Sequence, residues 1–343
     1  MRCTRAEFLT GTAGGFLGLL FQDPPGPKPV RSRTGIGDHS YGFRRFGDPL
    51  AFLEHARSLG AGGVQTALGA RDDAFTDRLR AKAEEHGLYL EGSIALPRNA
   101  ADVVRFAAET RTLKRCGASV FRTVLLGGRR YEVLESPDAL RAFLDQARQS
   151  VALARPVLEK AEVSAAIENH KDLRASELLD LVKAQDSPFI GVCVDLGNNI
   201  ALLETPEETV RTLAPHALST HVKDMGVEEY PDGFLLSEVP LGTGSLDLPA
   251  LIAALRRTRP GIRLNLEMMT RDPLKIPCLV PKYWAAFDGV PGDRLAAMLR
   301  WVRTNAAKAP LPRVSGLSRE DQGSREEENV KLCLQYSRQR LDE

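Results

Sequence analysis

The sequence lacks three features that would point to common alternatives. Its five cysteines are scattered and form no C-x-x-C pair, which argues against a disulfide framework and against a structural zinc site. Its formal net charge is only +1, so nothing indicates a nucleic acid or an anionic membrane as the main partner. No G-x-G-x-x-G turn follows the first predicted strand, which disfavours a doubly wound sheet. What remains is an ordinary globular composition, 43% hydrophobic and 27% charged.

Residues 1–30 differ from the rest and are left out of the fold prediction. Two arginines precede a short apolar, glycine-rich run, which is too short to be a stable membrane span. The layout resembles a bacterial twin-arginine export signal, because Arg5, Phe8 and Leu9 match its core. Ala6 stands where the second arginine belongs. We therefore expect export to the periplasm, with a retained anchor or a cytoplasmic protein as alternatives.

From Thr34 onward, short β-like runs alternate with amphipathic helical stretches. The β-like runs cover residues 34–41, 62–68, 88–96, 119–126, 163–169, 189–195, 218–224 and 262–267. Eight strands, each followed by a helix, are typical of a closed barrel. We predict an α/β fold, a (β/α)₈ TIM barrel over residues 31–308. The signal and its linker occupy residues 1–30, and a linker with an amphipathic helix occupies residues 309–343.

The last four predicted strands carry acidic or histidine side chains at their carboxyl ends. In each strand the larger apolar residues take one phase of the alternation, and the smaller or polar residues take the phase that suits a barrel lumen. Glu168, Asp195, His221 and Glu267 all fall on this inward phase. Barrel enzymes build their active sites at this end of the strands. We therefore expect the four side chains to converge.

Such a set is typical of a divalent metal site. Three carboxylates that converge without a cation repel one another and are expensive to desolvate, and a bound metal ion removes that cost. Oxygen-rich coordination with one imidazole favours Mn²⁺, with Mg²⁺, Co²⁺ or Zn²⁺ as alternatives. The sequence therefore predicts one divalent ion held by these four side chains.

Five short motifs resemble those of the xylose-isomerase-like superfamily of sugar isomerases and epimerases. They are "IENH", "VDLGNN", "HVKD", "PLGTGSLD" and "NLE", in this order. The resemblance covers residues 34–308 and implies that Glu168 and Glu267 are a catalytic acid–base pair as well as metal ligands. The chain departs from the ketose epimerases of this group at Asn198, where those enzymes usually carry a histidine.

The resemblance implies a metal-dependent isomerase or epimerase that acts on a small sugar or keto-sugar. In that chemistry the cation stabilises an enediolate as a Lewis acid, and carboxylates on either side take and return a proton. A lyase, either a dehydratase or a decarboxylase, stays open, because the same enediolate can expel water or arise by loss of CO₂. An apurinic endonuclease is disfavoured, because six histidines do not supply its three-zinc cluster. The intact ligand set disfavours a non-catalytic sugar-binding barrel.

Four further polar residues are predicted to bind the substrate. His170 and Lys223 share the inward phase, and His39 and Asn198 stand at the ends of the first and sixth strands. Each also has a purely structural interpretation, which for Lys223 is an ion pair with Asp224 or Glu168.

The chain changes character after residue 308. A linker precedes a charged helical stretch over residues 324–343, which carries one apolar stripe. We expect this helix to dock on its own barrel, and a subunit contact in a homo-oligomer is the alternative.

Overall fold

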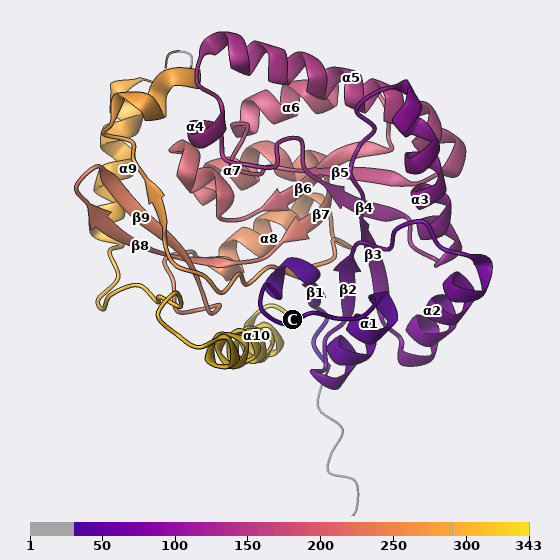
Figure 1. The fold of residues 1–343 in the computed structure, drawn as a ribbon. Helices are drawn as coiled ribbons and strands as arrows, with labels where there is room; N and C mark the ends of the chain where they lie inside the picture. Colours follow the sequence, from indigo (N-terminus) through magenta and orange to yellow (C-terminus); the bar gives the residue numbers. More distant parts are fainter. Residues whose placement is uncertain (1–30, 288, 290, 343) are drawn as a thin grey trace, which may run out of the picture. The chain divides into compact units, whose positions relative to one another are not determined.

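The computed structural model describes residues 31–287, 289 and 291–342, so the predicted export signal lies outside the described residues. Eight parallel strands form one sheet in the order β10-β1-β2-β3-β4-β5-β6-β7, with helices around it (Figure 1). The strands are β1 Gly35–Gly37, β2 Gly63–Thr66, β3 Tyr89–Ser93, β4 Val120–Thr123, β5 Ser164–Glu168, β6 Ile190–Asp195, β7 Ala217–His221 and β10 Asn265–Leu266.

The sheet closes on itself between its first and last strands. Val222, directly after β7, forms a parallel bridge with Leu266 of β10. The Val222 amide donates to the carbonyl of Asn265 at 2.7 Å, and the Glu267 amide donates to the carbonyl of Val222 at 3.0 Å. The predicted (β/α)₈ barrel is therefore confirmed. Every strand is shorter than the run that predicted it, because residues at one or both ends of each run lie outside the regular strand ladder.

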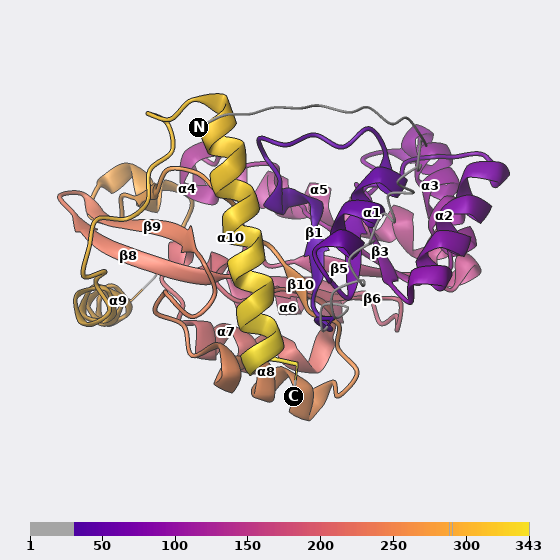
Figure 2. The same ribbon diagram turned by 90° about the horizontal axis from the view of Figure 1, so that it is seen from below.

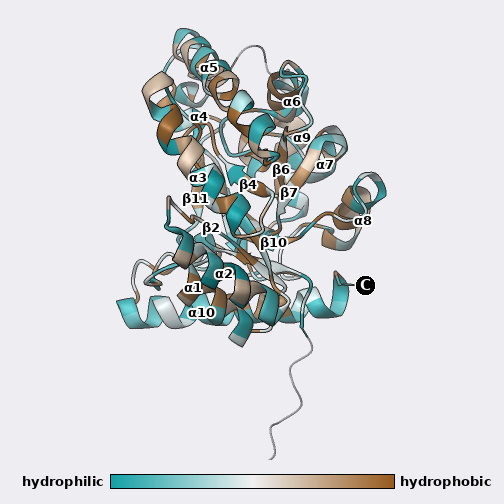
Figure 3. Ribbon diagram, turned by 90° about the vertical axis from the view of Figure 1, so that its right-hand side faces the viewer, coloured by the Kyte–Doolittle hydropathy of each residue, from teal (hydrophilic) through white to brown (hydrophobic). Residues whose placement is uncertain are grey.

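The helices of the barrel begin at ordinary start signals. Asp48 accepts a hydrogen bond from the Ala51 amide at 2.9 Å, and prolines occupy the first turns of α1, α5, α7 and α8. Figure 3 shows hydrophilic and hydrophobic residues along the same helices, as expected where one face packs and the other meets solvent. The helices are α1 Pro49–Ser58, α2 Asp73–His86, α3 Val103–Arg115, α4 Arg130–Val133, α5 Pro137–Ala161, α6 Ala175–Lys183, α7 Pro206–Leu213, α8 Leu248–Thr258 and α9 Gly292–Thr304. None of the described helices is both long and apolar enough to cross a bilayer.

A small antiparallel sheet follows β7 and was not predicted from the sequence. β8 (Asp224–Tyr230) and β9 (Gly233–Val239) form a hairpin, and β11 (Leu274–Ile276) adds a third strand beside β9. Every residue of β9 is buried. A strand that is buried on both faces lacks the period-2 alternation by which a half-exposed strand is recognised.

The C-terminal helix α10 (Arg319–Arg340) packs against the described barrel on the side of β1 and the β8–β9 hairpin (Figure 2). Its apolar stripe is buried, with Val330, Cys333 and Leu334 at most 1% exposed. The helix begins earlier than the predicted residue 324, because Ser318 caps it and accepts a hydrogen bond from the Asp321 amide at 3.1 Å.

The Glu326 carboxylate of α10 holds the loop after β1. It is fully buried and accepts hydrogen bonds from the backbone amides of residues 42, 43 and 44 at 2.6, 2.9 and 2.9 Å. Glu326→Ala would leave these partly buried donors without their partner, and an unsatisfied donor costs about 1–3 kcal/mol when fully buried and less where water reaches it. We expect the free energy of unfolding, measured in urea, to fall by about 2–4 kcal/mol. Glu328→Ala, on the exposed face of the helix, should change it by less than about 0.5 kcal/mol. An effect of Glu326→Ala as small as that of this control would contradict the prediction.

Candidate metal centre and substrate site

Four buried side chains from four neighbouring strands meet in the barrel lumen. Glu168, Asp195 and His221 are the last residues of β5, β6 and β7, and Glu267 directly follows β10. One ligand atom from each lies within 4.8 Å of those from the other three. All four side chains are at most 4% exposed. The structure thus brings together the set that strand alternation selected, and its role as a metal site stays a prediction.

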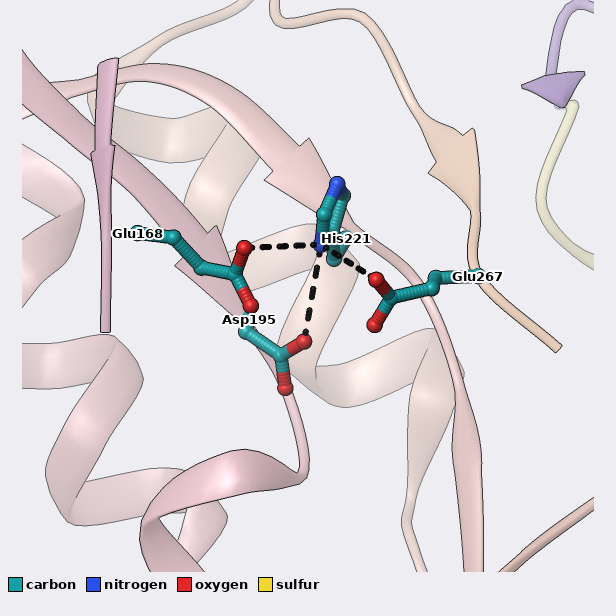
Figure 4. Close-up of side chains that lie close together, drawn as sticks. All are labelled: Glu168, Asp195, His221 and Glu267. Carbon is teal, nitrogen blue, oxygen red and sulfur yellow. Dashed lines mark ion pairs between the residues drawn. The ribbon is translucent and has the colours of Figure 1, made fainter. Parts of the chain in front are cut away.

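His221 lies at the centre of the set. Its Nδ1 atom is 3.5 Å from Glu168 Oε2, 3.7 Å from Asp195 Oδ2 and 3.3 Å from Glu267 Oε1. Glu168 and Glu267 approach from opposite sides of the imidazole (Figure 4). His221 Nδ1 and Asp195 Oδ2 are buried and have no hydrogen bond among the described residues, although Lys223 Nζ is an ion-pair partner of Asp195 Oδ2 at 2.8 Å. Two such atoms facing one another fit a divalent cation, which would bind both.

Hydrogen bonds orient the carboxylates toward this centre. Asp195 Oδ1 accepts from the backbone amides of Gly197 and Asn198 at 2.9 and 2.8 Å, which leaves Oδ2 facing His221. Glu168 Oε1 accepts from the side-chain amide of Asn198 at 2.8 Å, which leaves Oε2 facing His221. Asn198, predicted to bind substrate, is therefore fully buried and positions two members of the set.

Two cationic side chains contact the ligand set directly. Arg122 of β4 approaches Glu168 Oε2 with two of its nitrogens, each at 2.5 Å. Lys223 Nζ lies 2.8 Å from Asp195 Oδ2 and donates a hydrogen bond to Glu267 Oε2. Burial alone would raise the pKa of Glu168, but Arg122 and His221 hold it well below its usual value. The structural interpretation paired Lys223 with Asp224 or Glu168, whereas the structure pairs it with Asp195 and Glu267. Asp224 instead accepts hydrogen bonds from backbone amides of the turn after β9, and Glu168 pairs with Arg122.

Lys171 is a third buried cation, and the sequence did not single it out. Its side chain is 3% exposed, and its Nζ atom donates to Asn198 Oδ1, which lies 3.4 Å from Lys223 Nζ. Burial, and then the nearby Lys223 ammonium, lower the pKa of Lys171 to about 8. Across the described residues no carboxylate lies within ion-pair distance of Lys171, whereas Arg122 and Lys223 both have carboxylate partners. In the sequence, the only feature that could have pointed to Lys171 is that it lies three residues after Glu168.

The two predicted histidines lie at the edge of the set. His39 belongs to a short 3₁₀ helix after β1; its Nδ1 atom is 2.9 Å from Asp38 and its Nε2 atom 3.4 Å from Arg122. It also lines a cavity of about 600 Å³ that includes residues at the ends of β2 and β3. His170 has a buried Nδ1 atom without a hydrogen-bond partner among the described residues, and burial lowers its pKa to about 4. Both positions are consistent with the predicted contact with a substrate.

Metal binding should depend on pH through His221. Burial opposes protonation, but the acidic groups around it, Cys193, Glu267 and Glu168, raise its pKa well above the usual value. Protonation of the metal-free imidazole is therefore more favourable than in an ordinary histidine, and a metal ion that binds Nδ1 competes with that proton. We expect the affinity to rise with pH up to the raised pKa, with about one proton released per ion. Calorimetry in buffers of different ionisation enthalpy measures this number, and a pH-independent affinity without proton release would contradict the prediction.

Comparison with known proteins gives a matching family model and a relative by sequence. A family model described as a xylose isomerase-like TIM barrel matches residues 53–303. The 3-oxo-isoapionate decarboxylase of Pectobacterium atrosepticum is 28% identical over 246 residues, which are 68% of this chain and 84% of that protein.

Solved structures share the fold at low sequence identity. D-psicose 3-epimerase, solved in the presence of D-fructose, superposes with a TM-score of 0.59 at 15% identity and covers 90% of this chain and 99% of its own. A xylose isomerase-like TIM barrel protein from Mycobacterium smegmatis, solved in complex with magnesium, superposes with a TM-score of 0.53 at 15% identity and covers 80% and 97%. At this identity the likeness extends to the fold alone.

Proposed function

The chain belongs to the xylose isomerase-like TIM barrel family, and from this premise we propose that it is a metal-dependent decarboxylase of a small 3-oxo sugar acid. The extended sequence relative is a 3-oxo-isoapionate decarboxylase, whose name denotes the removal of a carboxyl group from a 3-oxo acid. Decarboxylation also belongs to the enolate chemistry that the ligand set suits. The proposal thus favours the lyase alternative over the isomerase or epimerase.

The observation that carries the proposal is the buried ammonium of Lys171, which has no carboxylate partner among the described residues. A buried charge without a counterion is destabilising by several kcal/mol. An anionic group of the substrate would supply the missing partner, whereas a neutral sugar would not. In the described structure the Lys171 ammonium is stabilised only by its hydrogen bond to Asn198 and by the more distant carboxylates of Glu238 and Asp195, and a carboxylate-bearing ligand would add a direct partner.

The charge of the whole site points the same way. Three carboxylates of the ligand set face three cationic side chains, Arg122, Lys171 and Lys223, so these six groups sum to zero. A divalent ion would add two positive charges. A site with that excess in a low-dielectric lumen favours an anion over a neutral ketose.

The reaction needs an electron sink and a proton donor, and no base to begin. When bound, the ion would supply Lewis-acid stabilisation of negative charge on the substrate oxygens. As the bond to the carboxyl carbon breaks, CO₂ leaves and the electron pair stays on the substrate as an enolate. Lys171 pairs with the carboxylate before this step and can then donate its proton to the carbon that carried the carboxyl group, regaining a proton from solvent. Arg122 and Lys223 stabilise the charged forms of Glu168 and Glu267, which makes both glutamates weak bases.

An isomerase or epimerase is the second candidate, and one observation favours it. Glu168 and Glu267 lie on opposite sides of His221 (Figure 4), as a pair that removes a proton on one face and returns it on the other would. In that case the two glutamates, and not Lys171, would move the substrate proton.

A substrate panel separates the two functions. Purified protein, stripped with a chelator and reloaded with Mn²⁺, would be incubated with 3-oxo sugar acids and with the matched neutral ketoses. We expect CO₂ release from at least one acid, in the metal-loaded protein only, and no turnover of the ketoses. Turnover of a neutral ketose with no acid decarboxylated would overturn the decarboxylase in favour of the epimerase.

Export is a separate proposal and rests on the sequence of residues 1–30 alone. The match of Arg5, Phe8 and Leu9 to a twin-arginine signal predicts that the mature protein begins beyond about residue 20. Mass spectrometry of the protein recovered from periplasmic and cytoplasmic fractions measures the N-terminus. An intact N-terminus on cytoplasmic protein would contradict export.

A further inference from the structure

A layer of buried polar side chains lies in the barrel next to the ligand set. It consists of Gln65 of β2, Glu91 of β3, Ser219 of β7 and Asn265 of β10, and we call it the Glu91 layer. These side chains are at most 1% exposed. Only one of them touches the proposed metal site, because Gln65 Oε1 lies 2.7 Å from His221 Nε2.

When Glu91 is ionised, the hydrogen bonds within the Glu91 layer run in only one direction. Glu91 Oε2 is contacted by Gln65 Nε2 at 3.1 Å, Ser219 Oγ at 2.6 Å and Asn265 Nδ2 at 2.9 Å. An ionised carboxylate accepts and cannot donate, so the amide nitrogen of Gln65 must face Glu91. The amide oxygen of Gln65 then faces His221, and His221 Nε2 must carry the hydrogen of that bond.

The tautomer of His221 follows from this chain of contacts. With the hydrogen on Nε2, the lone pair of a neutral imidazole is on Nδ1, the atom that faces the three carboxylates. We infer that Glu91, which contacts neither a member of the ligand set nor the substrate cavity, is a positioning residue that fixes the metal-binding tautomer of His221 through Gln65. This inference rests on the proposed metal site.

Burying the Glu91 carboxylate without an ion pair is energetically unfavourable, which supports a role for Glu91 beyond filling the lumen. Its carboxylate is 1% exposed, and no ion pair to it is found in the described part of the chain. Burial raises the pKa of Glu91, and the hydrogen bonds from Ser219 and Gln65 oppose that rise. A glutamine of the same size would fill the space without a buried charge, but an amide can both donate and accept, so the direction of the Gln65 amide would no longer be fixed.

A charge swap tests the inference. Glu91→Gln alone should weaken Mn²⁺ binding by about 10- to 100-fold, the usual effect of losing a group that orients a metal ligand. The double variant Q65E/E91Q puts the carboxylate next to His221 and an amide behind it, which again forces the hydrogen onto Nε2. We expect its Kd to return to within about threefold of the wild type. Ser219→Ala is the matched control. It removes a donor to Glu91 and an acceptor of Gln65 Nε2, but Nε2 keeps its bond to Glu91 Oε2, so the direction of the Gln65 amide is unchanged and the Kd should also stay within about threefold.

Two readouts are required, the Kd for Mn²⁺ by calorimetry and the ring ¹⁵N shifts of His221 in Zn²⁺-loaded protein. The wild type and the double variant should show a protonated Nε2 atom, and Glu91→Gln should show a mixture of tautomers or loss of the bound form. Unchanged Kd and tautomer in Glu91→Gln would overturn the inference. So would a double variant as weak as Glu91→Gln, because only packing would then matter. A wild type that binds no metal would instead overturn the proposed function, and this inference with it.

Discussion

His221→Ala should yield a folded protein that retains no stoichiometric metal, whereas the wild type should retain about one equivalent. The imidazole is the only nitrogen ligand in the set and lies within 3.7 Å of all three carboxylates. Without it, three buried carboxylates would have to hold the ion with incomplete coordination. Since the ion supplies the charge stabilisation of the reaction, we expect turnover to fall by at least about 10³-fold.

The matched control is His216→Ala, because His216 is half-buried just before β7 and outside the ligand set. Metal content by plasma emission spectrometry and turnover should both match the wild type in this variant. Full metal content in His221→Ala would contradict the proposed ligand set, and so would full activity in the chelator-treated wild type.

Lys171→Met should separate substrate chemistry from metal binding. Lys171 contacts Asn198 and no member of the ligand set, so the metal content should stay at about one equivalent. Loss of the carboxylate partner and of the proton donor should lower kcat/KM for the 3-oxo acid by about 10²- to 10⁴-fold. Methionine also removes a buried charge without a counterion, so the substrate-free variant should melt at a higher temperature than the wild type.

The sign of this stability effect can be checked with pH. Burial lowers the pKa of Lys171 to about 8 from its usual value of 10.5, so between these values the unfolded chain binds more protons than the folded one. Wild-type stability therefore gains from Lys171 as pH rises through this window, and the Lys171→Met variant should lose that gain. Lys183→Met, at an exposed position of α6, is the control and should change neither kcat/KM nor the melting temperature measurably. A Lys171→Met variant with near-normal kcat/KM would remove the main support for an anionic substrate.

The ligand set could be predicted from the sequence because strand geometry is periodic. Glu168, Asp195 and His221 are the last residues of their strands, and alternation decides which face each occupies. Eight strand–helix repeats close the barrel, and this closure places the carboxyl ends of the strands at one rim. The same regularity applies to Arg122 in the run "SVFRTVLL", although Arg122 was not among the predicted site residues.

The remaining parts of the site depend on geometry that has no period. Lys171 lies beyond the end of β5, where the chain has left the ladder, so no alternation gives its direction. The role proposed for Lys171 depends on its contact with Asn198 and on the lack of a carboxylate within ion-pair distance in the described structure. The β8–β9 hairpin and the hydrogen-bond direction around Glu91 likewise depend on partners that are far apart in the sequence.

The most direct test of the account is the fate of the carboxyl carbon and of one hydrogen. The Mn²⁺-loaded enzyme would turn over a 3-oxo sugar acid, labelled with ¹³C at its carboxyl group, in D₂O. The reaction would be followed by NMR after removal of the paramagnetic ion. The account predicts one ¹³CO₂ per turnover and one deuteron on the carbon that carried the carboxyl group, and it predicts that Lys171→Met loses both together. A product that keeps the labelled carboxyl group and carries deuterium beside the carbonyl would contradict it, because proton transfer without loss of CO₂ is the reaction of an epimerase.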